Sequence, residues 1–429
     1  MDTDAPTSAR LAALHASIIR GDTDAAKRFW QDIAQRGAPL IEPADAAGQR
    51  CLVTFLWRGG SHAADQAVRL ASPLVDADTA QPTLTRLGDS DVWYTTCRVP
   101  ADYRGTYRFA LDEQADARPG APQQAYVVDP LNARTYTLPA DDEIAERRAV
   151  TLSLLELPAA PPQPWCLPQP ASPRGRVEIQ WFRSARLGNE RRVWVYTPPG
   201  ALAAAASYPL LVLLDGWAYT QVVPTPTILD NLIAAGALPP LVALFPDSLD
   251  DRTRTRELTG NEAFVAFLAE ELLPWARRRY PLIADPARTI VAGSSFGGLA
   301  AAHAALRRPD LFGNVLAQSG AFRWAPPGDD EMEWLARPYI ASPRLPLRFY
   351  LDIGRYELAT HGAGINRLVG NRHFRDILRA KGYPVTYAEF SGGHQYLCWQ
   401  GTLSDGLIAL LGGEQQPSST DEDGIHAPA

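Results

Sequence analysis

The residues whose types and spacing best suit chemistry form a G-x-S-x-G sequence, GSSFG (293–297), with Ser295 at its centre. This sequence follows the apolar run RTIVAG (288–293) and leads into a small-residue stretch, GLAAAHAALRR, that predicts a helix. Such a strand-to-helix turn lifts a serine hydroxyl above the sheet, and glycines are required where side chains would clash. N–H groups at the start of the helix would stabilise negative charge beside the serine. An ordinary glycine-rich turn is the alternative, but this context predicts that Ser295 is a nucleophile.

A serine attacks well only when a base removes its proton, and in the α/β-hydrolase order the acid and the histidine follow the serine. His394 lies in SGGHQYLCW, after the strand-like run VTYAEF and a two-glycine turn. That position is the carboxyl end of a strand, where the site of a parallel sheet is expected. We therefore predict His394 as the general base. The other histidines after Ser295 lie on its own helix, between the last strands or in the tail: His303, His361, His373 and His426.

The acid that orients the histidine is predicted to be Glu357, just beyond the strand-like run LRFYLDIG (347–354). Asp352 would serve instead if that strand ended earlier, and either residue could be an ordinary solvated carboxylate. The oxyanion hole should combine the backbone N–H groups of Phe296 and Trp217. Trp217 follows the Asp215-Gly216 turn that ends YPLLVLLDG.

The elements that must position these residues divide the chain into parts. Residues 1–157 predict a helix over 8–37 and then short alternating strands, which favour a small all-β sandwich. Proline-rich residues 158–175 predict a semi-rigid linker. Residues 176–413 predict the esterase domain, and the polar residues 414–429 a disordered tail.

In the esterase domain, near-continuous apolar runs alternate with helical stretches such as 261–280 and 374–382, and RVEIQWF and RRVWVYTP predict a hairpin before them. This alternation predicts a doubly wound, mostly parallel sheet of the α/β-hydrolase class. The apolar runs are YPLLVLLDG, LVALFP, RTIVAG, NVLAQSG and LRFYLDIG.

Bulk composition excludes several classes of function. The 429 residues are 46% hydrophobic and carry a net charge of −7, which argues against general affinity for nucleic acid or anionic membranes. The four cysteines are far apart, so we expect reduced thiols in the cytoplasm and neither disulfides nor a zinc site. We find no signal peptide, no membrane-length apolar run and no H-E-x-x-H, P-loop or G-x-G-x-x-G context.

The chain resembles the enterochelin (ferric enterobactin) esterases over nearly its whole length. In the front part the resemblance rests on VTFLWRG, DVWYTT, YRGTYRF and VVDPLNARTY, and in the rear part on VLLDGWAY, RTRELTGNEAF, TIVAGSSFGGL, LAQSGAF and SGGHQYLCWQGTL. The resemblance implies an N-terminal immunoglobulin-like domain before an esterase-D-like α/β-hydrolase. It also implies hydrolysis of the trilactone of ferric enterobactin in the cytoplasm, without a cofactor, because iron arrives only with the substrate.

Under this resemblance, Ser295, His394 and Glu357 match the family's catalytic residues, and Arg254 and Glu257 match a segment near its active site. A ferric tricatecholate is a flat-armed trianion, so arginines and aromatic platforms suit it. The predicted binding residues are therefore Arg254, Arg256, Trp217, Tyr219, Trp324 and Trp399, although each could be merely solvated or part of the core.

Two other functions stay open on the sequence. The first is a general carboxylesterase acting on feruloyl, acetyl or similar esters. The second is a binding protein that holds a ligand without cleaving it, which the complete Ser295, Glu357 and His394 set disfavours. We expect the front domain to pack over the mouth of the site, and we consider a homodimer.

Overall fold

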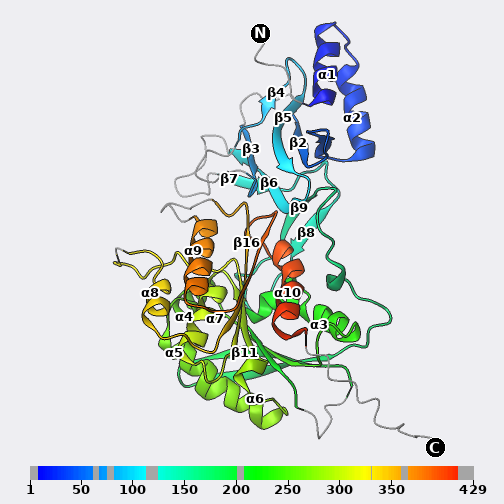
Figure 1. The fold of residues 1–429 in the computed structure, drawn as a ribbon. Coiled ribbons are helices and arrows are strands. Elements are labelled where there is room, and N and C mark those ends of the chain that lie inside the picture. Colours follow the sequence, from blue (N-terminus) through cyan, green and yellow to red (C-terminus); the bar gives the residue numbers. More distant parts are fainter. Residues whose placement is uncertain are drawn as a thin grey trace, which may run out of the picture.

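The computed structural model describes residues 8–60, 67–74, 82–112, 124–200, 207–329, 331–358 and 366–413. A β-rich front domain stands at one end of the molecule and an α/β domain at the other (Figure 1). Within the described ranges, no helix is both long enough and apolar enough to cross a membrane. The predicted tail, 414–429, lies outside the described residues.

The chain opens with two helices, α1 (Ala9–Ile19) and α2 (Ala25–Arg36), and the prediction of one helix over 8–37 is wrong. Gly21 has a left-handed φ of 84°, which ends the first helix and turns the chain back. Leu11 and Trp30 of the two helices share a buried cluster with Leu56 and Val92 of the neighbouring strands. The apolar faces read from the sequence were therefore right, although the turn between them was missed.

The front domain contains two antiparallel sheets whose inner faces share one core, with Phe55 from the first sheet and Tyr107 and Phe109 from the second. This arrangement matches the expected all-β sandwich. The first sheet has the order β1 (Leu40–Pro43), β2 (Arg50–Arg58), β5 (Val92–Pro100), β4 (Thr85–Arg86). The second has the order β3 (Val68–Ala71), β6 (Arg104–Asp112), β9 (Val150–Glu156), β8 (Thr135–Leu138), and β7 (Gln124–Val127) pairs with β6.

The α/β domain is built on one eight-stranded sheet that confirms the predicted doubly wound class. An antiparallel hairpin forms one edge, and the six strands after it run parallel to one another. The order is β10 (Arg176–Ser184), β11 (Asn189–Thr197), β13 (Val242–Pro246), β12 (Leu210–Leu213), β14 (Thr289–Ser294), β15 (Asn314–Gln318), β16 (Arg348–Gly354), β17 (Val385–Phe390).

Helices cover both faces of this sheet, which explains why its strands read as continuous apolar runs. Val291 faces the cluster beneath one set of helices, while Ile290 faces the opposite cluster. Figure 1 shows α9 and α10 on either side of β16. The first face carries α4 (Asp251–Leu258), α5 (Glu262–Ala266), η4 (Phe267–Leu272), α6 (Leu273–Arg279), α7 (Phe296–Arg307), α8 (Ala336–Ala341) and α9 (Arg367–Ala380). The second carries η2 (Pro164–Cys166), η3 (Ala218–Val222), α3 (Thr225–Ala234) and α10 (Tyr396–Leu411), and η5 (Pro286–Arg288) precedes β14.

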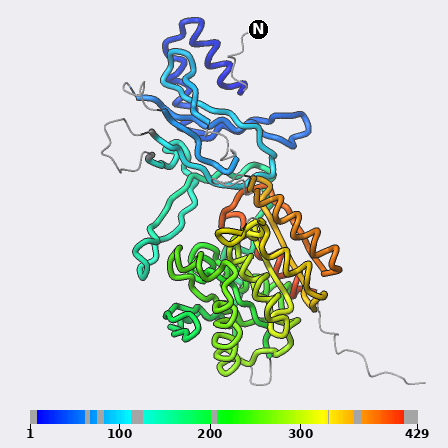
Figure 2. Tube along the Cα trace, turned by 90° about the vertical axis from the view of Figure 1, so that its left-hand side faces the viewer, coloured from blue at the N-terminus to red at the C-terminus, as the bar shows by residue number. Residues whose placement is uncertain are grey.

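Two segments tie the front domain to the α/β domain. Proline-rich residues 158–175 pack along the α/β domain, where Asn231 Nδ2 donates to the carbonyls of Trp165 and Leu167 at 2.8 and 2.9 Å. The second segment, residues 139–149 between β8 and β9, is called the β8–β9 arm below. The teal part of the trace extends from the front domain along the α/β domain (Figure 2). The arm makes ion pairs with the α/β domain that are described below.

Candidate active site

Ser295 occupies a strained turn between β14 and α7. Its φ of 57° and ψ of −119° lie in a backbone region that costs a non-glycine residue about 1–3 kcal/mol. A Cβ on Gly293 would lie 2.6 Å from the backbone of Gly297, so no larger residue fits at that position. The Ser295 N–H donates to the Gln318 carbonyl at 2.9 Å, and the Ser295 carbonyl accepts from the Ala321 N–H at 2.9 Å. These bonds hold the turn in the conformation that the motif predicts.

His394 follows β17 and its ring is bonded to Glu357. The Nδ1 atom of His394 lies 2.6 Å from Oε2 of Glu357, whose side chain is only 1% exposed. The other carboxylate oxygen accepts from the Ser319 hydroxyl at 2.6 Å and from the Gly354 N–H at 3.0 Å. With Nδ1 engaged, the second ring nitrogen, Nε2, is left to take a proton from a nucleophile.

Asp352, the alternative acid, is not hydrogen-bonded to His394, whose Nδ1 atom contacts Glu357 instead. It is fully buried on β16, and its carboxylate accepts from the Ser319 N–H at 3.3 Å. Burial raises the pKa of Asp352 to about 7, against hydrogen bonds from Thr402 and Gln318 that favour the charged form. The geometry therefore brings Glu357, and not Asp352, to the histidine.

Two backbone N–H groups suit an oxyanion. Phe296 is the first residue of α7, so its N–H has no acceptor within the helix. The Tyr219 N–H donates to the Asp215 carbonyl at 3.1 Å, which places Trp217 in the first turn of a helical segment and leaves its N–H equally unengaged. Asp215 has a left-handed φ of 61°, and a Cβ on Gly216 would lie 2.2 Å from the Phe245 carbonyl oxygen. A side chain at position 216 would therefore collide with β13, so the turn that presents the Trp217 N–H requires glycine there.

Ser295 and His394 line the same cavity of about 320 Å³ at the carboxyl ends of the parallel strands. This volume is near the lower end of small-molecule sites. The other lining residues come from the front domain, from the segments that follow β12 and β13, from α4, from the end of β14 and from α10: Arg147, Asp215, Trp217, Ala218, Asp247, Ser248, Asp250, Asp251, Arg254, Ser294, Tyr396 and Trp399.

Arg254 lines this cavity as predicted, but its charge is already paired. Its Nε and Nη2 atoms each lie 2.7 Å from an oxygen of Asp215, and its guanidinium lies over the Phe296 ring at 5.8 Å. Burial alone would raise the pKa of Asp215, but the Arg254 guanidinium holds it below its ordinary value. The pair stays ionised and joins the two segments that carry the predicted oxyanion donors.

Three predicted binding residues do not line the cavity. Tyr219 is fully buried and its hydroxyl donates to Gln318 at 2.8 Å, because the turn after β12 directs it into the core. The Arg256 side chain is 60% exposed, on the outer face of α4. Trp324 packs edge-on against Trp334 at 5.6 Å.

Trp399 lines the cavity but is only 3% exposed, so it is part of the wall rather than an open platform. Its Nε1 donates to the Ser319 hydroxyl at 2.9 Å, and its ring lies edge-on to His394 at 4.8 Å. Glu257, matched by resemblance, is buried against Arg191 at 2.8 Å, where it holds α4 on the sheet.

Sequence reasoning missed two residues of this site. Ser319 directly follows β15 with a left-handed φ of 49° and bridges Glu357 and Trp399. A polar residue at the carboxyl end of a buried strand was the available signal. Arg147 reaches the cavity from the β8–β9 arm of the front domain, and nothing near it in the sequence indicated that.

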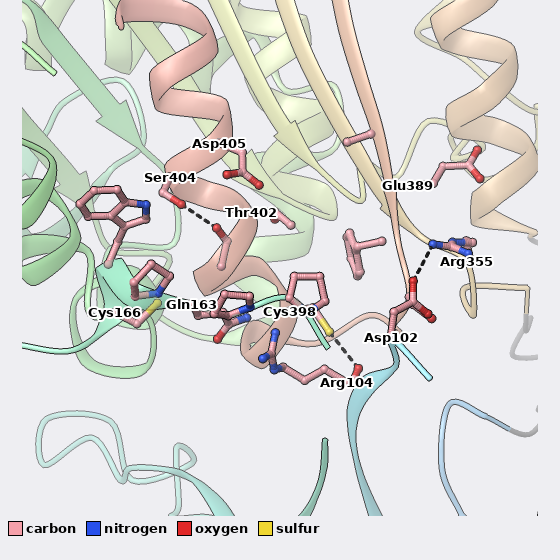
Figure 3. A pocket seen from close by; sticks show the side chains of 18 residues that line it. Asp102, Arg104, Gln163, Cys166, Arg355, Glu389, Cys398, Thr402, Ser404 and Asp405 are labelled. Atoms are coloured by element: carbon pink, nitrogen blue, oxygen red, sulfur yellow. Dashed lines mark hydrogen bonds and ion pairs between the residues drawn. The ribbon is translucent and has the colours of Figure 1, made fainter. Parts of the chain in front are cut away.

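A second cavity, of about 330 Å³, is lined in part by Cys398, Thr402 and Asp405 of α10 (Figure 3). The front domain contributes Asp102 and Arg104 to it, the proline-rich segment contributes Gln163 and Cys166, and Asp102 pairs with Arg355 at 3.1 Å. None of the predicted catalytic residues lines it. In the parts of the chain that the structure describes, no group of three or more His, Cys, Asp or Glu side chains could hold a metal ion.

Comparisons with known proteins agree with this architecture. The family model described as "Putative esterase" matches residues 184–410, and that described as "Enterochelin esterase, N-terminal" matches residues 52–166. An iron(III) enterobactin esterase of Dickeya dadantii is 32% identical over 451 aligned residues, which cover 95% of this chain and 98% of the relative. An iron(III) salmochelin esterase of Escherichia coli is 27% identical and covers 94% of this chain and 98% of its own.

Solved structures give the same result. The enterobactin esterase of Shigella flexneri, crystallised in the presence of enterobactin, matches with a TM-score of 0.71 at 31% identity, covering 90% of this chain and 97% of its own. The ferric enterobactin esterase of Salmonella typhimurium matches with a TM-score of 0.72 at 29% identity, covering 90% and 98%. With a sandwich before an α/β domain, and relatives that match almost from end to end, this chain is an ester hydrolase that belongs to the enterochelin esterase family.

Proposed function

We propose that this ester hydrolase cleaves the ester bonds of a ferric catecholate siderophore, with Ser295 as nucleophile, His394 as general base and Glu357 as the orienting acid. The observation that carries the proposal is the bond between His394 and the buried Glu357, in a cavity that His394 shares with the strained Ser295. Such a set has little purpose in a protein that only binds its ligand.

In the proposed reaction, the Ser295 hydroxyl attacks the ester carbonyl carbon while His394 Nε2 takes its proton. The N–H groups of Phe296 and Trp217 hold the oxyanion of the tetrahedral intermediate. Glu357 stabilises the imidazolium, which then protonates the departing alkoxide. A water molecule, deprotonated by His394, attacks the acyl-serine, and the second tetrahedral intermediate collapses to a carboxylic acid and free Ser295.

The substrate class is supported by the relatives. The Dickeya protein is named for iron(III) enterobactin and the Escherichia coli protein for iron(III) salmochelin. Further Shigella structures, at 30% identity, were determined with 2,3-dihydroxy-N-benzoyl-serine and 2,3-dihydroxy-N-benzoyl-glycine. Cutting the trilactone separates the three catecholate arms, so the chelate loses preorganisation and releases iron more readily. We propose that the iron is cargo, that no resident cofactor takes part, and that the reaction occurs in the cytoplasm.

The test is incubation with ferric enterobactin, with chromatographic detection of linear and monomeric dihydroxybenzoylserine products. Ser295→Ala should abolish these products while leaving the protein folded. If wild-type protein leaves ferric enterobactin intact but hydrolyses 4-nitrophenyl butyrate, the serine hydrolase chemistry stands and the siderophore assignment is wrong. If Ser295→Ala retains full activity, the nucleophile is wrong.

A further inference from the structure

Arg147 is the one front-domain residue among those that line the candidate active site in the described parts of the chain. It lies on the β8–β9 arm, whose ends are anchored in the second sheet of the front domain. Its side chain is 20% exposed, although the residue is held between two domains. A residue of this kind belongs to the substrate cavity and also connects the two domains.

The arm is held in place by four charged side chains that alternate in sign. Arg147 contacts Asp247 at 3.1 Å and Asp141 at 2.9 Å, and Arg192 contacts the same two aspartates at 2.7 and 2.5 Å. The Leu249 carbonyl also accepts from Arg147 at 2.7 Å. Buried ion pairs of this type contribute little net stability because desolvation offsets their attraction. What they supply here is a fixed position for the arm.

Arg147 and Arg254 are the two arginines in the lining of the cavity, and nearby aspartates compensate the positive charge of each. Arg147 and Arg192 are balanced by Asp141 and Asp247, and Arg254 is balanced by Asp215. Of the two properties that suit arginine to a flat-armed trianion, charge and stacking, the charge is therefore already compensated in this geometry. The remaining property of Arg147 is its flat guanidinium, which lies over the Trp217 ring at 5.1 Å.

We propose that the Arg147–Trp217 pair is a stacking wall, supplied in part by the front domain, that selects substrates with a flat aryl group in the acyl part. A guanidinium is weakly hydrated and stacks readily on aromatic faces. Trp217 also carries a predicted oxyanion N–H, so a ring against this wall lies close to the reacting carbonyl. The cavity of about 320 Å³ suits one aryl arm at a time. That this arm is a catecholate rests on the function proposed above.

The experiment uses full-length protein and two uncharged substrates that differ only in the ring: N-benzoylserine methyl ester and N-acetylserine methyl ester. Wild-type protein should prefer the benzoyl ester in kcat/KM by about tenfold. Arg147→Ala should bring this ratio close to one, because kcat/KM for the benzoyl ester should fall about tenfold more than kcat/KM for the acetyl ester, mainly through a higher KM. The matched control is Arg148→Ala, since Arg148 is the next residue on the arm and is exposed.

Arg147→Lys separates stacking from charge and guards against loss of fold, because it keeps a cation beside Asp247 but has no flat face. It should lose the benzoyl preference as Arg147→Ala does. If both variants keep the preference for the benzoyl ester, the proposed stacking wall is wrong. It is also wrong if kcat/KM falls equally for both esters. Failure of wild-type protein to cleave ferric enterobactin, with the benzoyl preference intact, would count only against the siderophore assignment.

Discussion

Replacing Ser319 with alanine tests whether the support beneath Glu357 contributes to catalysis. The Ser319 hydroxyl donates to Glu357 at 2.6 Å and accepts from Trp399 at 2.9 Å, in a fully buried position. A hydrogen bond to a charged group contributes about 1.5–3 kcal/mol. The bonds from Gly354 and His394 still hold the carboxylate, so we take the lower end of that range. Since about 1.4 kcal/mol is a factor of ten in rate, kcat should fall about tenfold.

The assay is the pH dependence of kcat and KM for 4-nitrophenyl butyrate, because a residue that positions the dyad should change kcat and its pH profile but not KM. Ser404→Ala is the matched control. Ser404 is a buried serine of α10 whose hydroxyl donates a hydrogen bond to the Gly401 carbonyl at 2.7 Å, and it lines the second cavity instead of the candidate active site. The reasoning is refuted if folded Ser319→Ala keeps wild-type kcat, or if Ser404→Ala loses as much.

Three further outcomes are expected. Glu357→Gln should lower kcat by about 10²–10⁴-fold because the imidazolium loses its anionic partner, whereas Asp352→Asn should change kcat less than about threefold; equal losses in steady-state assays would reverse the choice of acid. Because the folded-state pKa of Asp352 is raised to about 7, above an unfolded value of about 4, this group makes the fold less stable as pH rises from about 4 to about 7. Urea unfolding at both ends of that range should show a smaller loss for Asp352→Asn than for wild type, and parallel losses would contradict the assignment. Gly216→Ala should abolish activity or lower the melting temperature strongly, since its Cβ would meet the Phe245 carbonyl oxygen at 2.2 Å, while Gly60→Ala, with open space around it, should not; wild-type melting of Gly216→Ala would show that the turn can adjust.

Most of what could be predicted about the fold and the candidate catalytic residues came from patterns that are local in the sequence. Ser295 was identifiable because the glycines of its turn and the apolar strand before it are adjacent in sequence. His394 and Glu357 followed from the order of residues along the chain and from their positions beyond strand ends. The two helices at the start were merged because amphipathic spacing continues across the turn at Gly21.

The binding residues were harder because the direction of a side chain depends on packing that the sequence does not display. Tyr219 and Trp217 lie two positions apart after the same strand, yet one is buried and the other faces the cavity. Arg256 was grouped with Arg254, but on a helix two residues apart point to different faces. Arg147 could not be found because its partner Asp247 is 100 positions away, in another domain.

That separation along the chain affects how the protein is made. When the β8–β9 arm leaves the ribosome, Arg147 can already pair with Asp141, but its second partner, Asp247, has not yet been synthesised. At about 5–20 residues per second, roughly 5–20 s pass before it follows. The front sandwich can fold early, with its charged arm still in water, and the arm docks only when the later strands have formed. Ser295 and His394, which line the same cavity, are synthesised later still, so a chain stopped before residue 247 would carry the arm without the partners and catalytic residues that complete the pocket.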